Sequence, residues 1–445
     1  MELSEQIFRA GVVGAGGAGF PTHKKLVEGV RLLVVNAAEC EPLLASDRHV
    51  MRHSAGDIIR ALALVQQEYA IPRVVIGTKQ KYSREIAALQ QAIAEQKAPI
   101  ELFTTVSFYP AGDEQVLIYE ITGETVPPGG IPLALGIVVI NVTTALNIAG
   151  AVQNKPVLRK FVTVTGEVGE AVVADVPVGT SVADCIRAAG GAKTDRYTII
   201  KGGPMMGPRY SMDKADSLFI GKADGGIILL AEDHPLIQFG QKPIEHMVNQ
   251  AKSVCIQCSS CTEMCPRYLI GHKMRPHRVM RSLATGTGGT DLTDALLCSE
   301  CGLCELFSCP MQLSPRKMNI YVKGILREEG VRDIDKNVYS EQSAPREYRR
   351  VGQQRIIDRL QLSAYPTHVD KVVVVEPLTV HIPLKHGVGR PSDAVVAVGS
   401  SVQPGDVIGK VEFADVGCMV HASIGGTVTS TDNGMVTIER KGGAG

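Results

Sequence analysis

The sequence contains no tryptophan, few aromatic residues and no net charge, and these absences exclude particular classes of partner. Phe, Tyr and Trp make up 4% of the 445 residues, too few for the stacking platforms that bind single-stranded nucleic acid. The 46 Lys and Arg residues balance 46 Asp and Glu residues, so the basic excess typical of nucleic-acid-binding proteins is missing. With 44% hydrophobic and 21% charged residues, the composition is that of a folded globular protein, and we expect no nucleic-acid partner.

Long apolar segments are also missing. The N-terminal segment Met1–Phe20 carries charges where a signal peptide would have its apolar region. The longest stretch without a charge, 125–154, is interrupted by Pro127, Pro128 and Pro132, which predicts a loop and a buried strand instead of a membrane helix. We therefore expect no membrane span and a soluble, reducing compartment, where clustered cysteines usually bind metal.

Changes in pattern along the chain predict a multidomain α/β and α+β protein. Residues 1–157 alternate apolar strands with helices, which indicates an α/β domain with a mainly parallel sheet. Residues 158–242 form a small α+β module, residues 243–365 turn helical, and residues 366–445 form an all-β domain. The strands expected in the first domain are Leu32–Val35, Val74–Gly77, Glu101–Thr105 and Ile137–Asn141, with helices at Gly56–Tyr69 and Lys81–Gln96. The α+β module is expected to contain a helix at Ser181–Ala189, and the last domain strands at Val372–Glu376, Ala394–Val398, Val407–Val411, Gly426–Ser430 and Met435–Glu439.

Cysteine is the most informative residue, because eight of the eleven lie between Cys255 and Cys309. They form two motifs, C-x2-C-x2-C-x3-C-P and C-x2-C-x2-C-x4-C-P. Three cysteines at this spacing can hold three corners of an iron–sulfur cube, and in two-cluster ferredoxins the last cysteine of each motif ligates the other cluster. The spacing thus predicts two [4Fe–4S] clusters, one bound by Cys255, Cys258, Cys261 and Cys309, the other by Cys298, Cys301, Cys304 and Cys265.

Two structural zinc sites are the alternative for these cysteines. Zinc sites use pairs of cysteines separated by a longer span, whereas three cysteines crowd together in each motif here. The remaining cysteines, Cys40, Cys185 and Cys418, lie in apolar or glycine-containing surroundings and are expected to be buried thiols without a chemical role.

A glycine-rich loop near the N-terminus, Gly14–Gly19, has the spacing G-x-G-x-x-G, and Glu39 follows twenty residues after its end. A Rossmann dinucleotide site requires a strand before such a loop and a helix after it. Here a helix-like segment precedes the loop and Phe20-Pro21 follows it, so the context argues against that site. The loop can still hold a phosphate through its backbone N–H groups, with a charge added by Lys24 or Lys25; a plain tight turn is the alternative.

Longer strings carry a resemblance to known families. The strings GAGGAGFPTHKKL, VVNAAECEP, YPAGDEQVLIYEITGETVPPGG and INVTTA resemble the FMN/NADH module of the flavin-bearing subunit of respiratory complex I and of the C subunit of the Rnf complex. KGGPMMG resembles their β-grasp (SLBB) domain, and PLKHGVG and VHASIGGTV resemble a barrel-sandwich domain. That domain precedes the flavin module in the Rnf protein but follows the clusters here, an order that resembles the cobalamin reductases of propanediol-utilisation microcompartments. The tail offers no lysine for lipoyl or biotin attachment at its predicted hairpin tip, so we expect a structural or docking domain there.

The resemblance also implies a Rossmann-like FMN/NADH domain and a set of cofactor contacts. Phe20 would stack on NADH, and Glu114 would help to orient it. The residues that would bind FMN and its surroundings are Gly14, Gly16, Gly17, Gly19, Lys25, Asn36, Glu39, Gly112, Asp113, Glu114 and Asn141.

The implied activity is electron transfer from NADH through FMN and two [4Fe–4S] clusters to a corrinoid, which is reduced from cob(III)alamin to cob(II)alamin and cob(I)alamin. No residue is expected to transfer protons in catalysis. The implied partners are an adenosyltransferase and a shell protein, and the implied location is cytoplasmic, inside a bacterial microcompartment. An electron-input subunit of an Rnf-like complex and a cluster-bearing scaffold without flavin are the alternatives.

Overall fold

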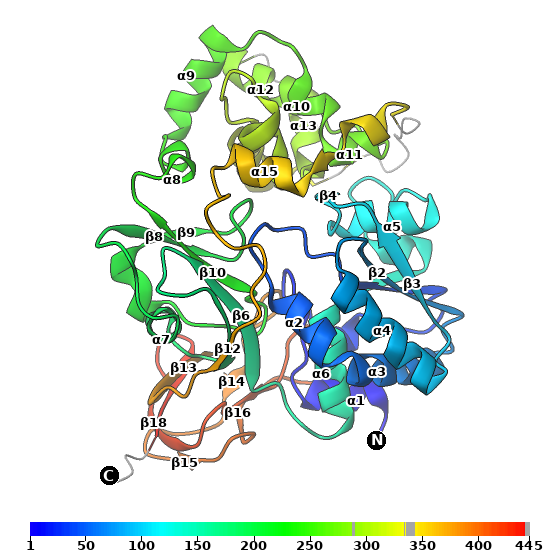
Figure 1. Ribbon diagram of the computed structural model, residues 1–445, viewed down its shortest axis with the longest axis vertical. Helices are drawn as coiled ribbons and strands as arrows, with labels where there is room; N and C mark the ends of the chain where they lie inside the picture. The colour runs from blue at the N-terminus through cyan, green and yellow to red at the C-terminus, as the bar shows by residue number, and fades with distance from the viewer. Residues whose placement is uncertain (287–289, 333, 335–342, 441–445) are drawn as a thin grey trace.

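A parallel sheet covered by helices forms the N-terminal part of the chain. In a computed structural model, which describes residues 1–286, 290–332, 334 and 343–440, its strand order is β3-β2-β1-β5 and all neighbouring pairs are parallel (Figure 1). β1 is buried along Leu32–Val35, as the apolar run predicts for a strand covered on both faces. The strands are β1 (Leu32–Asn36), β2 (Arg73–Lys79), β3 (Ile100–Thr105) and β5 (Ile137–Asn141), and the helices are α1 (Leu3–Arg9), α2 (Ser46–His53), α3 (Ala55–Glu68), α4 (Ser83–Gln96), α5 (Glu114–Thr122) and α6 (Val142–Val152).

The larger core lies on one face of this sheet, where α3 and α6 pack their apolar stripes against the strands. α5 covers the opposite face with Leu117 and Ile118. The expected helices and the mainly parallel sheet are thus confirmed, with boundaries shifted by one or two residues.

The second sheet is mixed and has the order β12-β7-β6-β10-β8-β9. Its apolar core lies between the strands and α7 (Val182–Ala188), which begins at the capping residue Ser181. One strand corrects the sequence analysis: the run Val372–Glu376 was expected in the C-terminal domain, but β12 (Val372–Val374) pairs in parallel with β7 at the edge of this sheet. The other strands are β6 (Arg159–Gly166), β7 (Val172–Pro177), β8 (Tyr197–Lys201), β9 (Arg209–Ser211) and β10 (Gly226–Ala231).

A helical lobe carries both cysteine motifs and lies at the top of the molecule in Figure 1. It is joined to the first domain by the short pair of β4 (Phe108–Tyr109) and β11 (Val351–Gly352). The predicted domain 243–365 includes residues 287–289, 333 and 335–342, which lie outside the described residues. Its helices are α9 (Ile244–Val254), α10 (Ser260–Glu263), α11 (Pro266–Leu269), α12 (Pro276–Thr285), α13 (Thr290–Thr293), α14 (Pro315–Glu328) and α15 (Gln353–Arg359), preceded by α8 (Pro235–Gly240).

The C-terminal part is a sandwich of two small antiparallel sheets, β13-β19-β18-β15 and β14-β16-β17, around a common apolar core. The expected strands Gly426–Ser430 and Met435–Glu439 are found at those bounds, and residues 441–445 of the predicted domain lie outside the described residues. The strands are β13 (Thr379–Pro383), β14 (Asp393–Ala394), β15 (Ser401–Val402), β16 (Val407–Lys410), β17 (Val420–His421), β18 (Gly426–Ser430) and β19 (Met435–Glu439).

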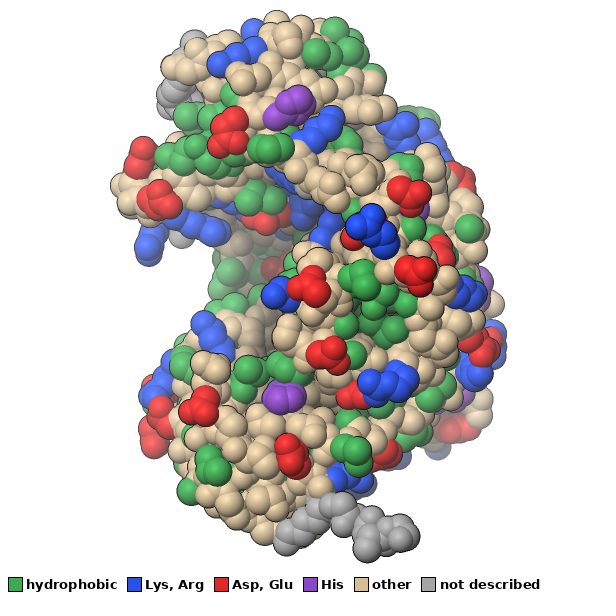
Figure 2. All heavy atoms as spheres, turned by 90° about the vertical axis from the view of Figure 1, so that its left-hand side faces the viewer, with side chains coloured by type: hydrophobic (Ala, Val, Ile, Leu, Met, Phe, Trp, Pro, Cys, Tyr) green, Lys and Arg blue, Asp and Glu red, His purple; other side chains and the backbone are tan. Residues whose placement is uncertain are grey.

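Seen from the side, the molecule is deeply hollowed between the helical lobe and the domains below it (Figure 2). Lys and Arg side chains and hydrophobic side chains both border this hollow (Figure 2). Within the described part of the chain, no helix is both long and apolar enough to cross a membrane.

Candidate functional site

The glycine-rich loop forms the wall of a cavity of about 570 Å³ at the carboxyl ends of β1 and β5. Ligands bind in this position in many open α/β sheets. The cavity gathers ten of the twelve residues expected to bind nucleotide: Gly14, Gly16, Gly17, Gly19, Phe20, Lys25, Asn36, Gly112, Glu114 and Asn141.

The other two expected residues, Glu39 and Asp113, line an adjoining cavity of about 440 Å³. The two cavities share part of their walls, including Gly16, Asn36 and Asn141. The second cavity continues to Ser299 and Cys301, so it links the glycine-rich loop to the second cysteine motif.

No α-helix directly follows the glycine-rich loop, and contacts with other segments hold it in place. Val13 and Pro21 form an isolated bridge at the base of the loop, and a single turn, Thr22–Lys24, comes next. The backbone of Ala15 is fixed from two directions, because its N–H donates to Thr144 Oγ1 at 2.9 Å and its carbonyl accepts from Lys160 Nζ at 3.0 Å. The expected absence of a Rossmann context at this loop is confirmed.

Two of the loop glycines differ in what surrounds them. A Cβ on Gly16 would lie 2.5 Å from Nδ2 of Asn141, so the close approach of loop and strand requires glycine there. A Cβ on Gly17 would meet nothing within 4 Å. The Cα of Gly17 therefore borders open space in the cavity wall, where a ligand can approach the backbone closely.

Asn36 and Asn141 occupy equivalent ends of neighbouring parallel strands and are register partners. Asn36 donates through Nδ2 to the Gly112 carbonyl at 2.8 Å, which fixes the segment before α5. Asn141 caps α6 by accepting from Thr143 N–H, and its Nδ2 donates to Asp47 Oδ2 at 2.7 Å. Both amides thus face the cavities while they hold their surroundings in place.

Asp113 and Glu114 are adjacent but have different environments. The Asp113 carboxylate caps α5 and forms an ion pair with Arg267 at 2.8 Å, so it holds the helical lobe against the first domain. Glu114 lines the first cavity near Lys25. Burial lowers the pKa of Lys25, and the charge of Glu114 partly offsets this effect.

Two carboxyl groups in the second cavity have raised pKa values. Burial, with a further contribution from Asp47, raises the pKa of Glu39 to about 7. Burial also raises the pKa of Glu41 to about 8, although one of its oxygens accepts from Met205 N–H at 2.9 Å. Near neutral pH Glu41 is therefore mostly protonated and Glu39 is protonated for part of the time.

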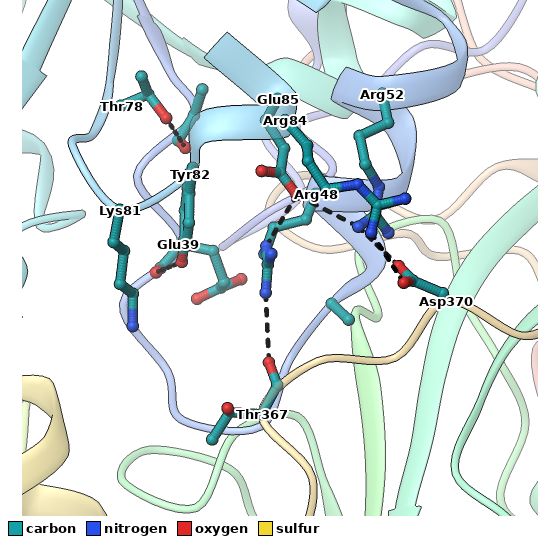
Figure 3. Close-up of polar contacts among 12 residues, drawn as sticks. Glu39, Arg48, Arg52, Thr78, Lys81, Tyr82, Arg84, Glu85, Thr367 and Asp370 are labelled. Atoms are coloured by element: carbon teal, nitrogen blue, oxygen red, sulfur yellow. Dashed lines mark hydrogen bonds and ion pairs between the residues drawn. The ribbon is translucent and has the colours of Figure 1, made fainter. Parts of the chain in front are cut away.

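A network of polar contacts surrounds the segment that contains Glu39 (Figure 3). The Glu39 carbonyl accepts from Lys79 Nζ at 2.5 Å and from Tyr82 OH at 3.1 Å. Arg48 donates to Glu85 at 3.0 Å and to the Thr367 carbonyl at 3.2 Å, so the chain that leads from the helical lobe to β12 is bound to α2. A second pair of contacts joins Arg52 and Arg84 to Asp370.

The first three cysteines of the first motif come together with the last cysteine of the second. Cys255, Cys258, Cys261 and Cys309 line one small cavity, and Cys258 is exposed. The other four thiols also lie near one another: burial raises the pKa of Cys265, and the nearby thiols of Cys301 and Cys298 raise it further. The pKa of Cys304 is raised well above its ordinary value by burial and by Cys298.

The two cysteine loops have the same backbone form. Gln257 and Ser259 in the first motif adopt left-handed conformations, with φ of 55° and 62°. Glu300 and Gly302 occupy the corresponding positions of the second motif, with φ of 59° and 81°. The repeated sequence motif therefore adopts the same backbone conformation twice.

The second cysteine loop is in direct contact with the first domain. Tyr109, whose side chain is buried, donates through its OH to the Cys301 carbonyl at 2.6 Å. Cys301 also lines the second cavity together with Glu39 and Asp113. The cavity wall is therefore continuous from the glycine-rich loop to this thiol.

Cys40, Cys185 and Cys418 were expected to be buried, and this expectation fails for one of them. Cys185 and Cys418 are buried, but Cys40 is half-buried and lines the second cavity. Burial raises the pKa of the Cys40 thiol, with a further contribution from Glu39, so this group stays protonated.

Sequence reasoning missed several residues that line or support the cavities: Glu41, Asp47, Thr144, Lys160 and Gly202–Gly203. Glu41 lies inside the string VVNAAECEP and Gly202 inside KGGPMMG, so both strings carried a signal for the site. Lys160 has no such signal, because it belongs to a different domain from the loop that it contacts.

Four family models match successive parts of the chain. They are the Nuo51 FMN-binding domain over residues 7–150, the SLBB domain over 161–209, the 4Fe-4S dicluster domain over 254–314, and the RnfC barrel sandwich hybrid domain over 367–442.

Two curated proteins illustrate the range of relatives. The chain is 38% identical to the cobalamin reductase PduS of Salmonella typhimurium, over 99% of this chain and 96% of that protein. It is 32% identical to the C subunit of the Na(+)-translocating ferredoxin:NAD(+) oxidoreductase complex of Acetobacterium woodii, over 60% of this chain and 58% of that protein.

A solved structure shares the fold. The crystal structure of an NAD+-reducing [NiFe]-hydrogenase in the H2-reduced state matches with a TM-score of 0.50 and 19% identity. The match covers 75% of this chain and 63% of the hydrogenase chain.

Proposed function

The chain belongs to the family of the PduS cobalamin reductases, and from this premise we propose that it transfers electrons from NADH through FMN and two [4Fe–4S] clusters to a corrinoid. Its general class is that of a flavin and iron–sulfur oxidoreductase, given the matching FMN-binding and dicluster models. The observation that carries the finer proposal is the continuous cavity wall from the glycine-rich loop to Cys301.

The first cavity is lined by residues whose chemistry suits FMN. Backbone N–H groups at Gly16 and Gly17 border it, and Lys24 and Lys25 add positive charge for a phosphate. Asn36 and Asn141 supply amide groups farther in, and Phe20 supplies an aromatic face at the wall for a nicotinamide or adenine ring.

The two groups of four thiols fit iron–sulfur clusters better than zinc. A zinc ion draws its thiolates to within about 2.3 Å of one point. Among the described residues, no three His, Cys, Asp or Glu side chains converge in the way that a single ion requires. Cys255, Cys258, Cys261 and Cys309 instead surround a small cavity, which suits a polyatomic cluster.

The chemistry that the cofactors supply is the conversion of a two-electron hydride donor into one-electron transfers. The chain's own residues would bind and orient these groups. Phe20, Glu114 and Lys25 would position NADH and FMN, and the second cysteine group, through Cys301, lies nearest to that site. The first group, with the exposed Cys258, would be the point from which electrons leave the protein.

The corrinoid is proposed as a transient substrate, reduced from cob(III)alamin to cob(II)alamin and then to cob(I)alamin. Within a microcompartment, an adenosyltransferase would accept cob(I)alamin directly, and a shell protein would retain the complex. Direct transfer predicts that adenosylation continues when a scavenger of free cob(I)alamin is added; loss of adenosylation under that condition would disprove it.

The decisive experiment is an anaerobic assay of the purified protein. We expect one FMN and about eight iron atoms per chain, four for each cluster, and NADH-dependent appearance of the cob(I)alamin absorption band. Reduction of ferredoxin without reduction of the corrinoid would favour the Rnf-like alternative. Clusters without flavin would favour a scaffold, and zinc in place of iron would contradict the proposal.

A further inference from the structure

A loop of the C-terminal sandwich lies directly on the glycine-rich loop. The N–H of Val388 donates to the carbonyl of Ala18 at 2.9 Å. Gly387 and Gly19 face each other with φ of 77° and 67°, and a Cβ on Gly387 would lie 2.2 Å from the Ala18 carbonyl oxygen. A side chain at position 387 would therefore force the two loops apart.

The sandwich also contacts the segments on either side of the glycine-rich loop. Before it, the buried Lys222 joins the two parts, because it donates to the Gly11 carbonyl at 2.7 Å and to the Met419 carbonyl at 3.0 Å. After it, the Phe413 ring packs against His23 with centroids 5.3 Å apart, and Lys24 Nζ lies 5.1 Å from the centre of the same ring. The stretch 11–24 is thus held by the sandwich at its start, its turn and its end.

These contacts add to the two that fix Ala15, because the glycine-rich loop lacks the flanking elements of a Rossmann site. In a Rossmann site the preceding strand and the following helix fix the glycine-rich turn. Here only the bridge between Val13 and Pro21 and the short turn Thr22–Lys24 flank the loop. Neither Gly387 nor Val388 belongs to the apolar core of the sandwich. Their loop therefore contacts the glycine-rich loop and not the interior of its own domain.

We propose that Gly387 and Val388 are positioning residues of the nucleotide site, and that the C-terminal sandwich holds the glycine-rich loop in the geometry that binds FMN. This inference rests on the proposed function, and it gives the sandwich a part in cofactor binding beyond the structural or docking role expected from the sequence.

The test compares two glycine substitutions within the sandwich. Gly387→Ala and Gly434→Ala both place a side chain at a positive φ, 77° and 69°, but a Cβ on Gly434 meets nothing within 4 Å. After removal of FMN, the dissociation constant for added FMN should rise about tenfold or more in Gly387→Ala, because small displacements of a binding loop are costly. Gly434→Ala should bind FMN like the unsubstituted protein, and both variants should keep their iron. Unchanged FMN affinity in a folded Gly387→Ala protein would overturn the proposal.

Amide hydrogen exchange in the unsubstituted protein gives a second, independent measurement, which decides the matter if Gly387→Ala does not fold. Added FMN should slow exchange at Val388 together with the glycine-rich loop, and should leave the hairpin turn at Asn433–Gly434 unchanged. Protection of the glycine-rich loop without protection of Val388 would overturn the proposal. Failure of the unsubstituted protein to bind FMN is a different result, because it would overturn the proposed function itself.

Discussion

The two cysteine groups share a motif and a backbone form but lie in contrasting surroundings. In the first group Cys258 is exposed, and the neighbouring Ile256 is 63% exposed. In the second, Cys301 and Cys304 are buried, and the loop is bonded to Tyr109. The same sequence pattern thus builds one site that faces solvent and one that borders the cavity beside the glycine-rich loop.

The second cysteine group also has a lysine side chain beside it. At the second group, Lys323 donates to the Cys298 carbonyl at 2.5 Å and forms an ion pair with Glu300 at 2.8 Å. Lys323 is buried, so its charge lies in a region where it can offset the negative charge of a bound cluster. Surroundings of this kind tune the potential of an iron–sulfur site, so we expect the two clusters to differ in potential.

The largest effects are expected from removing one ligand at each group. Cys301→Ser should block electron flow from NADH to both clusters, because it damages the group that borders the nucleotide cavities. Cys258→Ser should block corrinoid reduction and leave the second cluster reducible by NADH, as followed by electron paramagnetic resonance. NADH oxidation with an artificial acceptor that reacts at the flavin should survive in both variants. Reduction of the first cluster by NADH in Cys301→Ser would reverse the proposed order.

The next largest effect concerns the ion pairs near the two groups. Arg267→Met should lower the free energy of unfolding by about 3 kcal/mol, because it leaves the buried Asp113 carboxylate without its cation. The side chains of this pair are only 10% and 11% exposed. Arg349→Met removes the more exposed pair with Glu263 and should cost less than about 1 kcal/mol. Chemical denaturation of the anaerobic protein measures both, and equal losses would contradict the contrast in burial.

A smaller effect is expected at Tyr109. Tyr109→Phe leaves the buried Cys301 carbonyl without its donor and should cost about 1.5 kcal/mol. It should also slow the reduction of the second cluster by NADH, because the cysteine loop loses a fixed point. Tyr348→Phe is the matched control, since Tyr348 is 92% exposed. Identical unfolding curves for the two variants would show that the hydrogen bond contributes nothing.

The last prediction is a pH dependence at Glu41, which lines the second cavity. Because burial raises the pKa of Glu41 to about 8, the native protein holds a proton that the unfolded chain releases near pH 4.3. The contribution of Glu41 to the stability of the FMN-free protein should therefore be complete below that lower value and be lost as pH rises towards 8. Glu41→Gln should reduce the fall in thermal midpoint between pH 5 and pH 8, whereas the exposed control Glu412→Gln should not. A midpoint that falls equally in both would disprove the assignment.

The sequence predicted local features well and contacts between domains poorly. The apolar run Leu32–Val35 and the helical spacing in Gly56–Tyr69 depend on neighbours in the chain, and the structure confirms both. The assignment of Val372–Glu376 to the last domain was wrong. The residues of an edge strand do not indicate which sheet the strand will join.

The candidate site follows the same rule. The sequence motifs predicted its glycines and its strand-end asparagines. Lys160 and Val388 were not predicted, because they reach the glycine-rich loop from other domains. The binding of FMN by these residues, and the division of the eight cysteines between two clusters, remain predictions.

The place of β12 has a mechanical consequence for the helical lobe. The chain leaves the six-stranded sheet after β10, builds the lobe, and returns to the same sheet at β12. The lobe is therefore anchored to one sheet at two points, three strand spacings or about 14 Å apart. Two anchors resist twisting of the lobe about either one, and the short β4–β11 pair adds a third attachment, to the first domain. These three attachments together fix the position of Cys301 relative to the glycine-rich loop.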